Sequence, residues 1–203
     1  LPLFVWMGEI LFRTKLSKNL FEGLSPWMQK LPGGLIHVNV VGCALFAAIS
    51  GSSAATVATV GKMSIPELRK RKYPEKILLG SLAGSGTLGL LIPPSIILII
   101  YGVTVQESIA KLFIAGILPG IMIAAIFMLY VVFWSLLNKK VMPKSFENFS
   151  FFEKIKKSKQ LLPVIILILA VIGSIYTGIA TATEAASLGV LGALILSYFQ
   201  KSL

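Results

Sequence analysis

The 203-residue chain is 56% hydrophobic and 13% charged, and its mean hydropathy is +0.86. Since a soluble domain carries about 25% charged residues, this composition excludes an ordinary soluble protein and indicates a membrane protein whose apolar surface is covered by lipid. The formal net charge is +11, but the basic residues cluster in short segments between apolar runs, which is typical of cytoplasmic loops and not of a nucleic-acid-binding protein. The single cysteine, Cys43, excludes an intrachain disulfide framework and a cysteine metal cluster.

The first 32 residues combine the end of a membrane helix with a short arm. Residues 1–12 are apolar and predict the end of a spanning helix, and we expect the chain to be a piece of a longer protein. Residues 21–31 alternate apolar and polar side chains at helical spacing, which favours an amphipathic helix at the membrane interface. Leu24 and Trp27 would then face the membrane. An ordinary connector is the alternative.

Five longer apolar segments follow the arm. A spanning helix needs about 20 mostly apolar residues, and segments that reach or approach this length cover residues 33–61, 77–102, 112–137, 161–176 and 185–199. The first two are uncharged but interrupted, one by a Ser-Gly-Ser-Ser sequence and the other by glycines and a pair of prolines. The last three read as plain spans.

The charges around residues 33–61 predict a re-entrant hairpin. Basic residues flank this segment on both sides, so a single crossing would put one basic loop on the outer side, against the positive-inside tendency. A hairpin that enters from the cytoplasm, turns at 50–53 and returns keeps both flanks inside. The later spans then alternate so that the basic loop at 139–159 is also cytoplasmic. A single long tilted span is the alternative.

The two interruptions predict one protected ion site. Irregular backbone survives at membrane depth only where protein or an aqueous cavity covers it. Freed carbonyls and hydroxyls form the oxygen ligand set that sodium prefers, and the N-termini of half-helices can face a carboxylate. The predicted ion and substrate ligands are Ser50, Gly51, Ser52, Ser53, Thr56, Ser85, Gly86, Thr87, Gly89, Pro93 and Pro94. Within this set, sodium is assigned to Ser52, Ser53, Gly86 and Thr87.

Simple packing is the competing interpretation of these breaks. Small residues four apart, such as Gly80 with Gly84 and Gly116 with Gly120, commonly allow helices to approach closely. A proline pair by itself also produces a kink. Breaks of matching depth in neighbouring segments favour the ion site.

Other chemistry finds little support in the sequence. His37 is the only histidine and has no acidic neighbour, so it indicates an interfacial or packing residue. The sequence around Lys62 lacks the glycine and the Ser or Thr of a phosphate-binding loop, which excludes an ATPase of that type. Glu184 is expected to cap the last helix. We therefore predict a protein that is not an enzyme and needs no cofactor other than sodium as a coupling ion.

A family resemblance rests on several stretches in a fixed order. They are PLFVWMGEIL at 2–11, GSSAAT at 51–56, GTLGLLIPPS at 86–95, LFIAGILPG at 112–120 and ATEAA at 182–186. In these stretches and their spacing the chain resembles the large membrane subunit of tripartite ATP-independent periplasmic (TRAP) transporters. Ala182 departs from the family pattern, which often has proline there, and this affects a helix entry and not the proposed site.

The resemblance implies a sodium symporter in the bacterial cytoplasmic (inner) membrane. Such proteins import a carboxylate, such as a C4-dicarboxylate or a sialic acid, which a periplasmic substrate-binding protein delivers. A small membrane subunit is the second implied partner, and membrane lipid surrounds both. The family fold has two inverted repeats, each with a re-entrant hairpin and a broken helix, that work as an elevator. This chain holds only the first of each, so it is not expected to transport alone.

The predicted fold is thus an all-α membrane protein that forms the first repeat of an elevator-type ion transporter. The expected parts are a helix end with an interfacial arm at 1–32, the hairpin at 33–61, a basic loop and broken helix at 62–111, a span and basic loop at 112–160, and a truncated second repeat at 161–203. Two rival functions remain: a sodium/anion symporter of related architecture without a binding protein, and a non-transport membrane scaffold.

Overall fold

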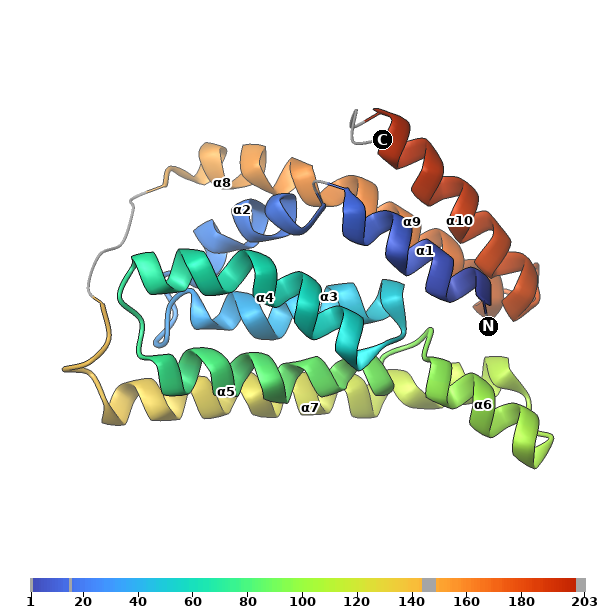
Figure 1. Cartoon of the computed structure of the whole chain (residues 1–203), viewed down its shortest axis with the longest axis horizontal. Helices are drawn as coiled ribbons and strands as arrows, with labels where there is room; N and C mark the ends of the chain where they lie inside the picture. The colour runs from blue at the N-terminus through green and yellow to red at the C-terminus, as the bar shows by residue number, and fades with distance from the viewer. Residues whose placement is uncertain (1, 15, 144–148, 200–203) are drawn as a thin grey trace.

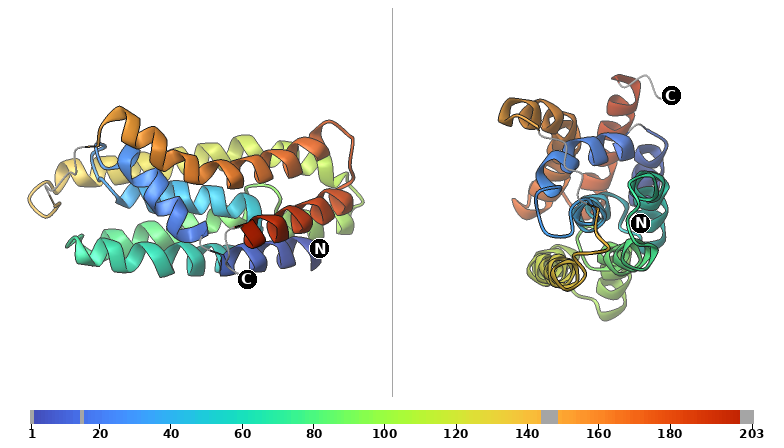
Figure 2. Two further views of the ribbon diagram at one scale, coloured as in Figure 1. Left: turned by 90° about the horizontal axis from the view of Figure 1, so that it is seen from above. Right: turned by 90° about the vertical axis from the view of Figure 1, so that its left-hand side faces the viewer.

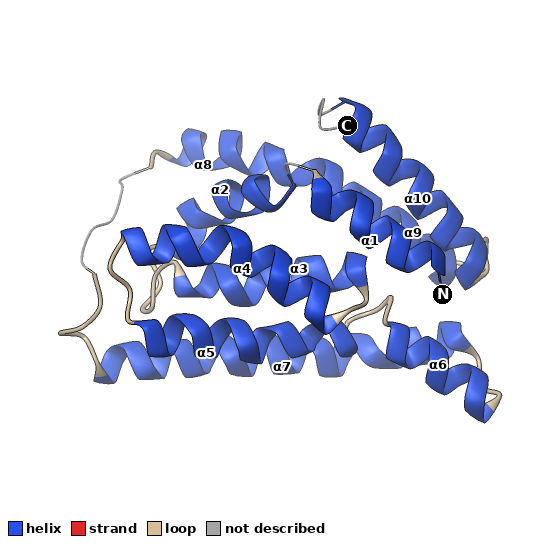
Figure 3. Cartoon of the chain, viewed as in Figure 1, coloured by secondary structure: helices blue, strands red, loops and turns tan. Residues whose placement is uncertain are grey.

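The computed structural model describes residues 2–14, 16–143 and 149–199, and within these ranges it contains helices and no strands (Figures 1 and 3). The α-helices are α1 (Pro2–Arg13), α2 (Leu16–Met28), α3 (Ile36–Ser50), α4 (Ser53–Lys70), α5 (Glu75–Gly86), α6 (Ile96–Val105), α7 (Ile109–Leu137), α8 (Phe151–Ser158), α9 (Leu162–Tyr176) and α10 (Ala182–Phe199). Two short 3-10 helices, η1 (Thr87–Leu90) and η2 (Lys159–Leu161), follow α5 and α8.

Helices α3 and α4 form a hairpin whose turn is set by two adjacent residues. Gly51 ends α3 in the left-handed conformation, with φ of 58°, and its amide donates to the carbonyl of Ala47 at 3.0 Å. A residue with a side chain is strained in that conformation, whereas glycine adopts it freely. Ser52 then begins α4 as its N-cap, because its hydroxyl accepts the amide hydrogen of Ala55 at 3.4 Å. A C-cap next to an N-cap reverses the chain within two residues.

The second arm of the hairpin is longer than the sequence predicts. Helix α4 continues past the expected end at Gly61 to Lys70, so its last turns belong to the charged segment that we expected to be a loop. At the open end of the hairpin, the amide of Leu35 donates to the hydroxyl of Tyr73 at 3.0 Å, which ties the start of one arm to the end of the other.

Helices α5 and α6 are the two halves of a broken helix. Proline has no amide hydrogen, so Pro93 and Pro94 remove the helical donors of the carbonyls four residues before them, at Gly89 and Leu90. The hydroxyl of Ser95 replaces one of these donors by bonding the Leu90 carbonyl at 2.6 Å, and it also accepts the amide hydrogen of Leu98 to cap α6. The break therefore begins after η1 and ends at a capped helix start.

The basic segments gather at one end of the long axis. Figure 1 shows the connections α2–α3 and α4–α5 and the C-terminal end of α7 at the left-hand end, while α6–α7 and α9–α10 turn at the right-hand end. The hairpin turn and the break in the α5–α6 helix lie between the two ends. This layout fits the predicted orientation, in which all basic loops share one side of the membrane.

Helix α3 is the centre of the molecule. Figure 2 shows it end-on, enclosed by α2, α4, α5 and α7. Nearly all of its residues are buried, including the polar His37 and Asn39, which have no exposed surface. Helices α1, α9 and α10 pack together beside this group. The first arm of the segment predicted to enter the membrane and return is therefore wrapped by protein, as polar side chains at membrane depth require.

The outer helices are apolar and exposed. Among the residues that the structure describes, three helical stretches are long and apolar enough to span a membrane, namely Ile109–Leu137, Phe151–Tyr176 and Ala182–Phe199. Along α7, Leu118, Leu129, Phe133 and Leu137 each leave about two thirds or more of their surface uncovered. A fold that buries polar side chains and exposes large apolar ones is that of an integral membrane protein, which confirms the all-α membrane class.

Part of the small-residue pattern is packing, as the alternative interpretation proposed. A side-chain carbon added to Gly116 would lie 3.0 Å from the Leu91 carbonyl oxygen, and one added to Gly120 would lie 2.9 Å from Ile92. Helix α7 thus uses this glycine pair to approach the break. Gly80 is different, because nothing lies within 4 Å of the space its side chain would occupy.

Helix α2, the predicted interfacial arm, shows that one prediction is wrong. Leu24 is 7% exposed and packs in the core with Leu20 and Phe21, so it does not face the membrane. Trp27 is exposed, and its indole nitrogen donates to the hydroxyl of Ser158 at 2.8 Å. The periodicity correctly predicts an amphipathic helix, but its apolar face meets protein because α3 and the α8–η2 segment lie against it.

Candidate functional site

The hairpin turn and the break meet directly. The amide of Ile96, the first residue of α6, donates to the carbonyl of Gly51 at 3.2 Å. A side-chain carbon on Gly89 would lie 2.8 Å from the backbone of both Ser52 and Ser53, and one on Gly51 would lie 2.5 Å from the Pro94 carbonyl. Both glycines are therefore needed for backbone to touch backbone, and the two segments that the sequence predicts to share one depth are in contact.

The turn holds a small network of hydroxyl groups. The Ser50 hydroxyl lies 2.9 Å from that of Thr56, which donates to the Ser52 carbonyl at 2.7 Å. The Ser52 amide in turn donates to the Ser50 hydroxyl at 3.3 Å. Ser50 and Thr56 are buried, whereas Ser52 and Ser53 are partly exposed. The turn therefore presents oxygen atoms that are already fixed in position by one another.

The predicted residues of the broken helix do not all face this turn. Gly86 packs against Val57 of α4, and Pro93 and Pro94 are buried beside the turn. The Ser85 hydroxyl is buried and donates to the Ser81 carbonyl at 2.5 Å, on the side facing α3. The Thr87 side chain is exposed, and its hydroxyl donates to the Gly84 carbonyl at 2.7 Å. The assignment of sodium to these residues stays a prediction.

Two buried polar residues that support the break and the hairpin were not among the predicted ligands. Ser95 has no exposed surface and holds the end of the break through its bond to Leu90. Asn39 donates to the Leu78 carbonyl at 3.2 Å and to the Ser81 hydroxyl at 3.0 Å, which fastens the hairpin to α5. The signal for Asn39 was present in the sequence, because it is an amide in the middle of an uncharged apolar run.

A cavity of about 380 Å³ opens beside the turn. Ser50 and Ser52 line it, together with the small side chains of Ala54, Ala55 and Ala58 on α4. Its remaining walls come from Ile96 and from α1, which contributes Glu9, a carboxylate paired with Arg13 at 2.7 Å. Volumes of about 300 to 1,000 Å³ suit small-molecule ligands, and the alanines keep this space open.

Helix ends of both polarities converge on this cavity. Helices α4 and α6 begin at the turn, and such N-termini carry partial positive charge that favours an anion. Helix α3 ends at the cavity, and the α5–η1 segment ends against the adjoining turn, so their carbonyls favour a cation at the turn. One place can therefore attract a carboxylate and a small cation together, which is the arrangement by which broken helices bind substrate and coupling ion.

A helical hairpin that meets a broken helix, among long helices with exposed apolar side chains, defines a multi-helix integral membrane protein. The family model for "Tripartite ATP-independent periplasmic transporter, DctM component" matches residues 1–203. The chain belongs to this family of TRAP transporter large permeases, which confirms the resemblance.

Curated relatives agree with the family match. The chain is 34% identical over 199 residues to the C4-dicarboxylate TRAP transporter large permease protein DctM of Pseudomonas aeruginosa, covering 98% of this chain and 46% of the relative. It is 35% identical to the isethionate TRAP transporter permease protein DctMQ of Oleidesulfovibrio alaskensis, in a match that covers 98% of this chain and 31% of the relative. It is 32% identical to the sialic acid TRAP transporter large permease protein SiaM of Vibrio cholerae, in a match that covers 96% of this chain and 45% of the relative. The chain thus spans less than half the length of these relatives, which are transporters and not enzymes.

Proposed function

We propose that this chain is part of the membrane subunit of a sodium-coupled secondary transporter that imports a small organic anion. The proposal rests on the contact between the hairpin turn and the break in the α5–α6 helix, which the hydrogen bond from the Ile96 amide to the Gly51 carbonyl bridges. That contact gathers carbonyl and hydroxyl oxygens for a cation at the edge of a cavity toward which two helix N-termini converge.

The substrate class follows from the same cavity. Helix N-termini favour a negatively charged group, and the cavity volume of about 380 Å³ suits a small molecule. Relatives are named for C4-dicarboxylates, isethionate and sialic acid, all of which are organic anions, and also for ectoine. We therefore propose a carboxylate or a similar small anion as the cargo.

The proposed assembly extends beyond this chain. The family name supports a periplasmic substrate-binding protein and a small membrane subunit as partners, without an ATPase, and a location in the bacterial inner membrane. We also propose that the hairpin and the broken helix belong to the moving part of an elevator, because they are joined to each other more closely than to α1, α9 and α10.

The test is a sodium titration of anion uptake by the full-length protein, reconstituted with its subunit and binding protein. Thr87→Ala and Ser53→Ala should each raise the sodium concentration for half-maximal uptake by about tenfold, since one lost ligand oxygen worth about 1.4 kcal/mol gives that factor. Sodium should also raise the melting temperature of the parent protein, because a ligand stabilises the state to which it binds.

Two matched controls make the titration decisive. Thr104 lies in α6 and donates to the carbonyl four residues earlier at 2.8 Å, so Thr104→Ala removes a similar back-bonded hydroxyl far from the turn. Ser135→Ala removes the hydroxyl of a buried serine in α7. If all four variants behaved like the parent, the breaks would be packing features. Absence of any sodium effect on uptake or melting would reject sodium coupling itself.

A further inference from the structure

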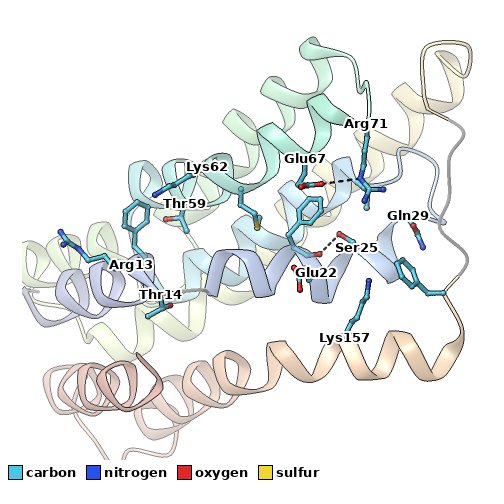
Figure 4. A pocket seen from close by; sticks show the side chains of 15 residues that line it. Arg13, Thr14, Glu22, Ser25, Gln29, Thr59, Lys62, Glu67, Arg71 and Lys157 are labelled. Atoms are coloured by element: carbon cyan, nitrogen blue, oxygen red, sulfur yellow. Dashed lines mark hydrogen bonds and ion pairs between the residues drawn. The ribbon is translucent and has the colours of Figure 1, made fainter. Parts of the chain in front are cut away.

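A second, larger cavity lies between the hairpin and the arm helices (Figure 4). Its volume is about 670 Å³, and residues of α1, α2, α4 and α8 line it. Figure 4 shows Lys62 above it on α4 and Lys157 below it on α8. None of these residues belongs to the predicted sodium site.

The basic side chains around this second cavity are only partly matched by acids. The lining contains four basic residues and two glutamates, Glu22 and Glu67. Arg13 pairs with Glu9 at 2.7 Å, and Arg71 lies 3.9 Å from Glu67. The two arginines therefore have carboxylate partners.

The two lysines are held in a different way. The Lys62 ammonium lies 5.6 Å from the centre of the Phe12 ring, and the Lys157 ammonium lies 3.9 Å from that of Phe149. A cation–π contact positions an ammonium group without neutralising its charge or using all its N–H donors. Both lysines can therefore still donate to an anion in the cavity.

The second cavity adjoins the one at the hairpin turn. Phe12 lines both of them. Along α4, Ala55 and Ala58 line the cavity at the turn, and Thr59 and Lys62, one turn further on, line the second cavity. Residues three and four apart share one helix face, so a single face of α4 borders both spaces. Phe12 stands at the boundary between them.

We propose that the second cavity is an anion site on the path of the cargo between the hairpin turn and the basic end of the molecule. Lys62 and Lys157 hold the negative group there, and the Phe12 ring separates this site from the cavity at the turn. The inference rests on the proposed function, since it requires an organic anion at the turn.

The test measures local charge with thiol reagents, which needs no transport. In full-length protein without other cysteines, Cys43→Ala removes the native thiol and Ser25→Cys places one at the cavity wall. The rates of reaction with an anionic and with a cationic methanethiosulfonate reagent are then compared. Lys62→Gln and Lys157→Gln should each lower the anionic-to-cationic rate ratio by about fivefold, because each removes a nearby positive charge.

Lys154→Gln is the matched control. Lys154 belongs to the same helix as Lys157 and also lies over an aromatic ring, that of Trp27 at 5.3 Å, but it does not line the cavity. Its loss should change the ratio by less than about twofold. Equal changes of the rate ratio in Lys154→Gln and Lys157→Gln would overturn the proposed anion site. Because this readout does not depend on sodium, it remains valid if the sodium titration fails.

The occupant is tested by protection of the same cysteine. Succinate, sialic acid or isethionate should slow labelling of Ser25→Cys, and Lys62→Gln should weaken that protection. If none of these anions protects, the cargo path is rejected. If labelling depends instead on whether the vesicles contain phosphatidylglycerol or only phosphatidylcholine, the cavity binds a lipid phosphate and the assignment to the cargo is wrong.

Discussion

The hairpin with its broken helix and the long helix α7 lie side by side but differ in which side chains they bury and which they expose. Helix α7 runs for 29 residues without a break, and its exposed side chains are large and apolar. The hairpin and the α5–α6 helix are interrupted where they meet, and their serine, threonine and asparagine side chains are mostly buried. The contrast teaches that the hairpin and the broken helix hold buried polar side chains and irregular backbone that must be shielded from lipid, whereas α7 turns large apolar side chains outward.

The largest expected difference between the two regions is topological. Single cysteines at Lys30 and Lys70, one on each flank of the hairpin, should both be shielded from a membrane-impermeant thiol reagent added outside intact cells carrying the Cys43→Ala full-length protein. A cysteine at Glu107, in the exposed connection before α7, should be labelled. Labelling of Lys30→Cys or Lys70→Cys alone would mean that the segment crosses the membrane once, as α7 does.

The next effect concerns the contact itself. Gly89→Ala should abolish uptake by the reconstituted transporter, since its side-chain carbon would lie 2.8 Å from the backbone at Ser52 and Ser53. Gly80→Ala, in the same broken helix, has open space and should retain uptake. Melting curves of both variants show whether each protein is folded. Normal uptake by folded Gly89→Ala would disprove the need for backbone contact at this point.

A smaller effect is expected where the hairpin is fastened to α5. Asn39→Leu removes hydrogen bonds to Leu78 and Ser81 and should lower the free energy of unfolding by about 1–2 kcal/mol, seen as a lower melting temperature. Asn138→Leu, which breaks a local bond to Trp134 at the end of α7, should cost about 0.5 kcal/mol or less. Equal losses of unfolding free energy in the two variants would show that the buried amide of Asn39 stabilises the fold no more than the amide of Asn138.

Some of this contrast could be read from the sequence, because it depends on local chemistry. Glycine next to serine at 51–52 supplies a C-cap and an N-cap, so the hairpin turn was predicted at the correct residues. In the second segment the predicted break at 85–89 is helical, and the chain leaves the helix only after Leu90, where the paired prolines 93–94 remove two helical donors. The all-α membrane class followed from composition, and the ordered motifs indicated the family.

Other features depend on tertiary contacts that periodicity does not contain. An amphipathic pattern does not say whether its apolar face meets lipid or protein, so Leu24 was wrongly assigned to the membrane. The charges after Gly61 suggested a loop, although a helix that leaves the membrane can carry them on its surface. Both cavities and the bond from Ile96 to Gly51 arise only when distant segments meet.

The lengths of the helices have an electrical consequence. At 1.5 Å per residue, α7 is about 43 Å long and exceeds a hydrocarbon core of about 30 Å, whereas α3 is about 22 Å long and ends inside it. Beyond the hairpin turn, α6 covers only about 15 Å toward the opposite face. A sodium ion that reaches the turn from that face would cross about half of the membrane potential, worth about 1 kcal/mol per 100 mV. If the turn is the sodium site that we propose, sodium binding there should tighten as the membrane potential becomes more negative inside.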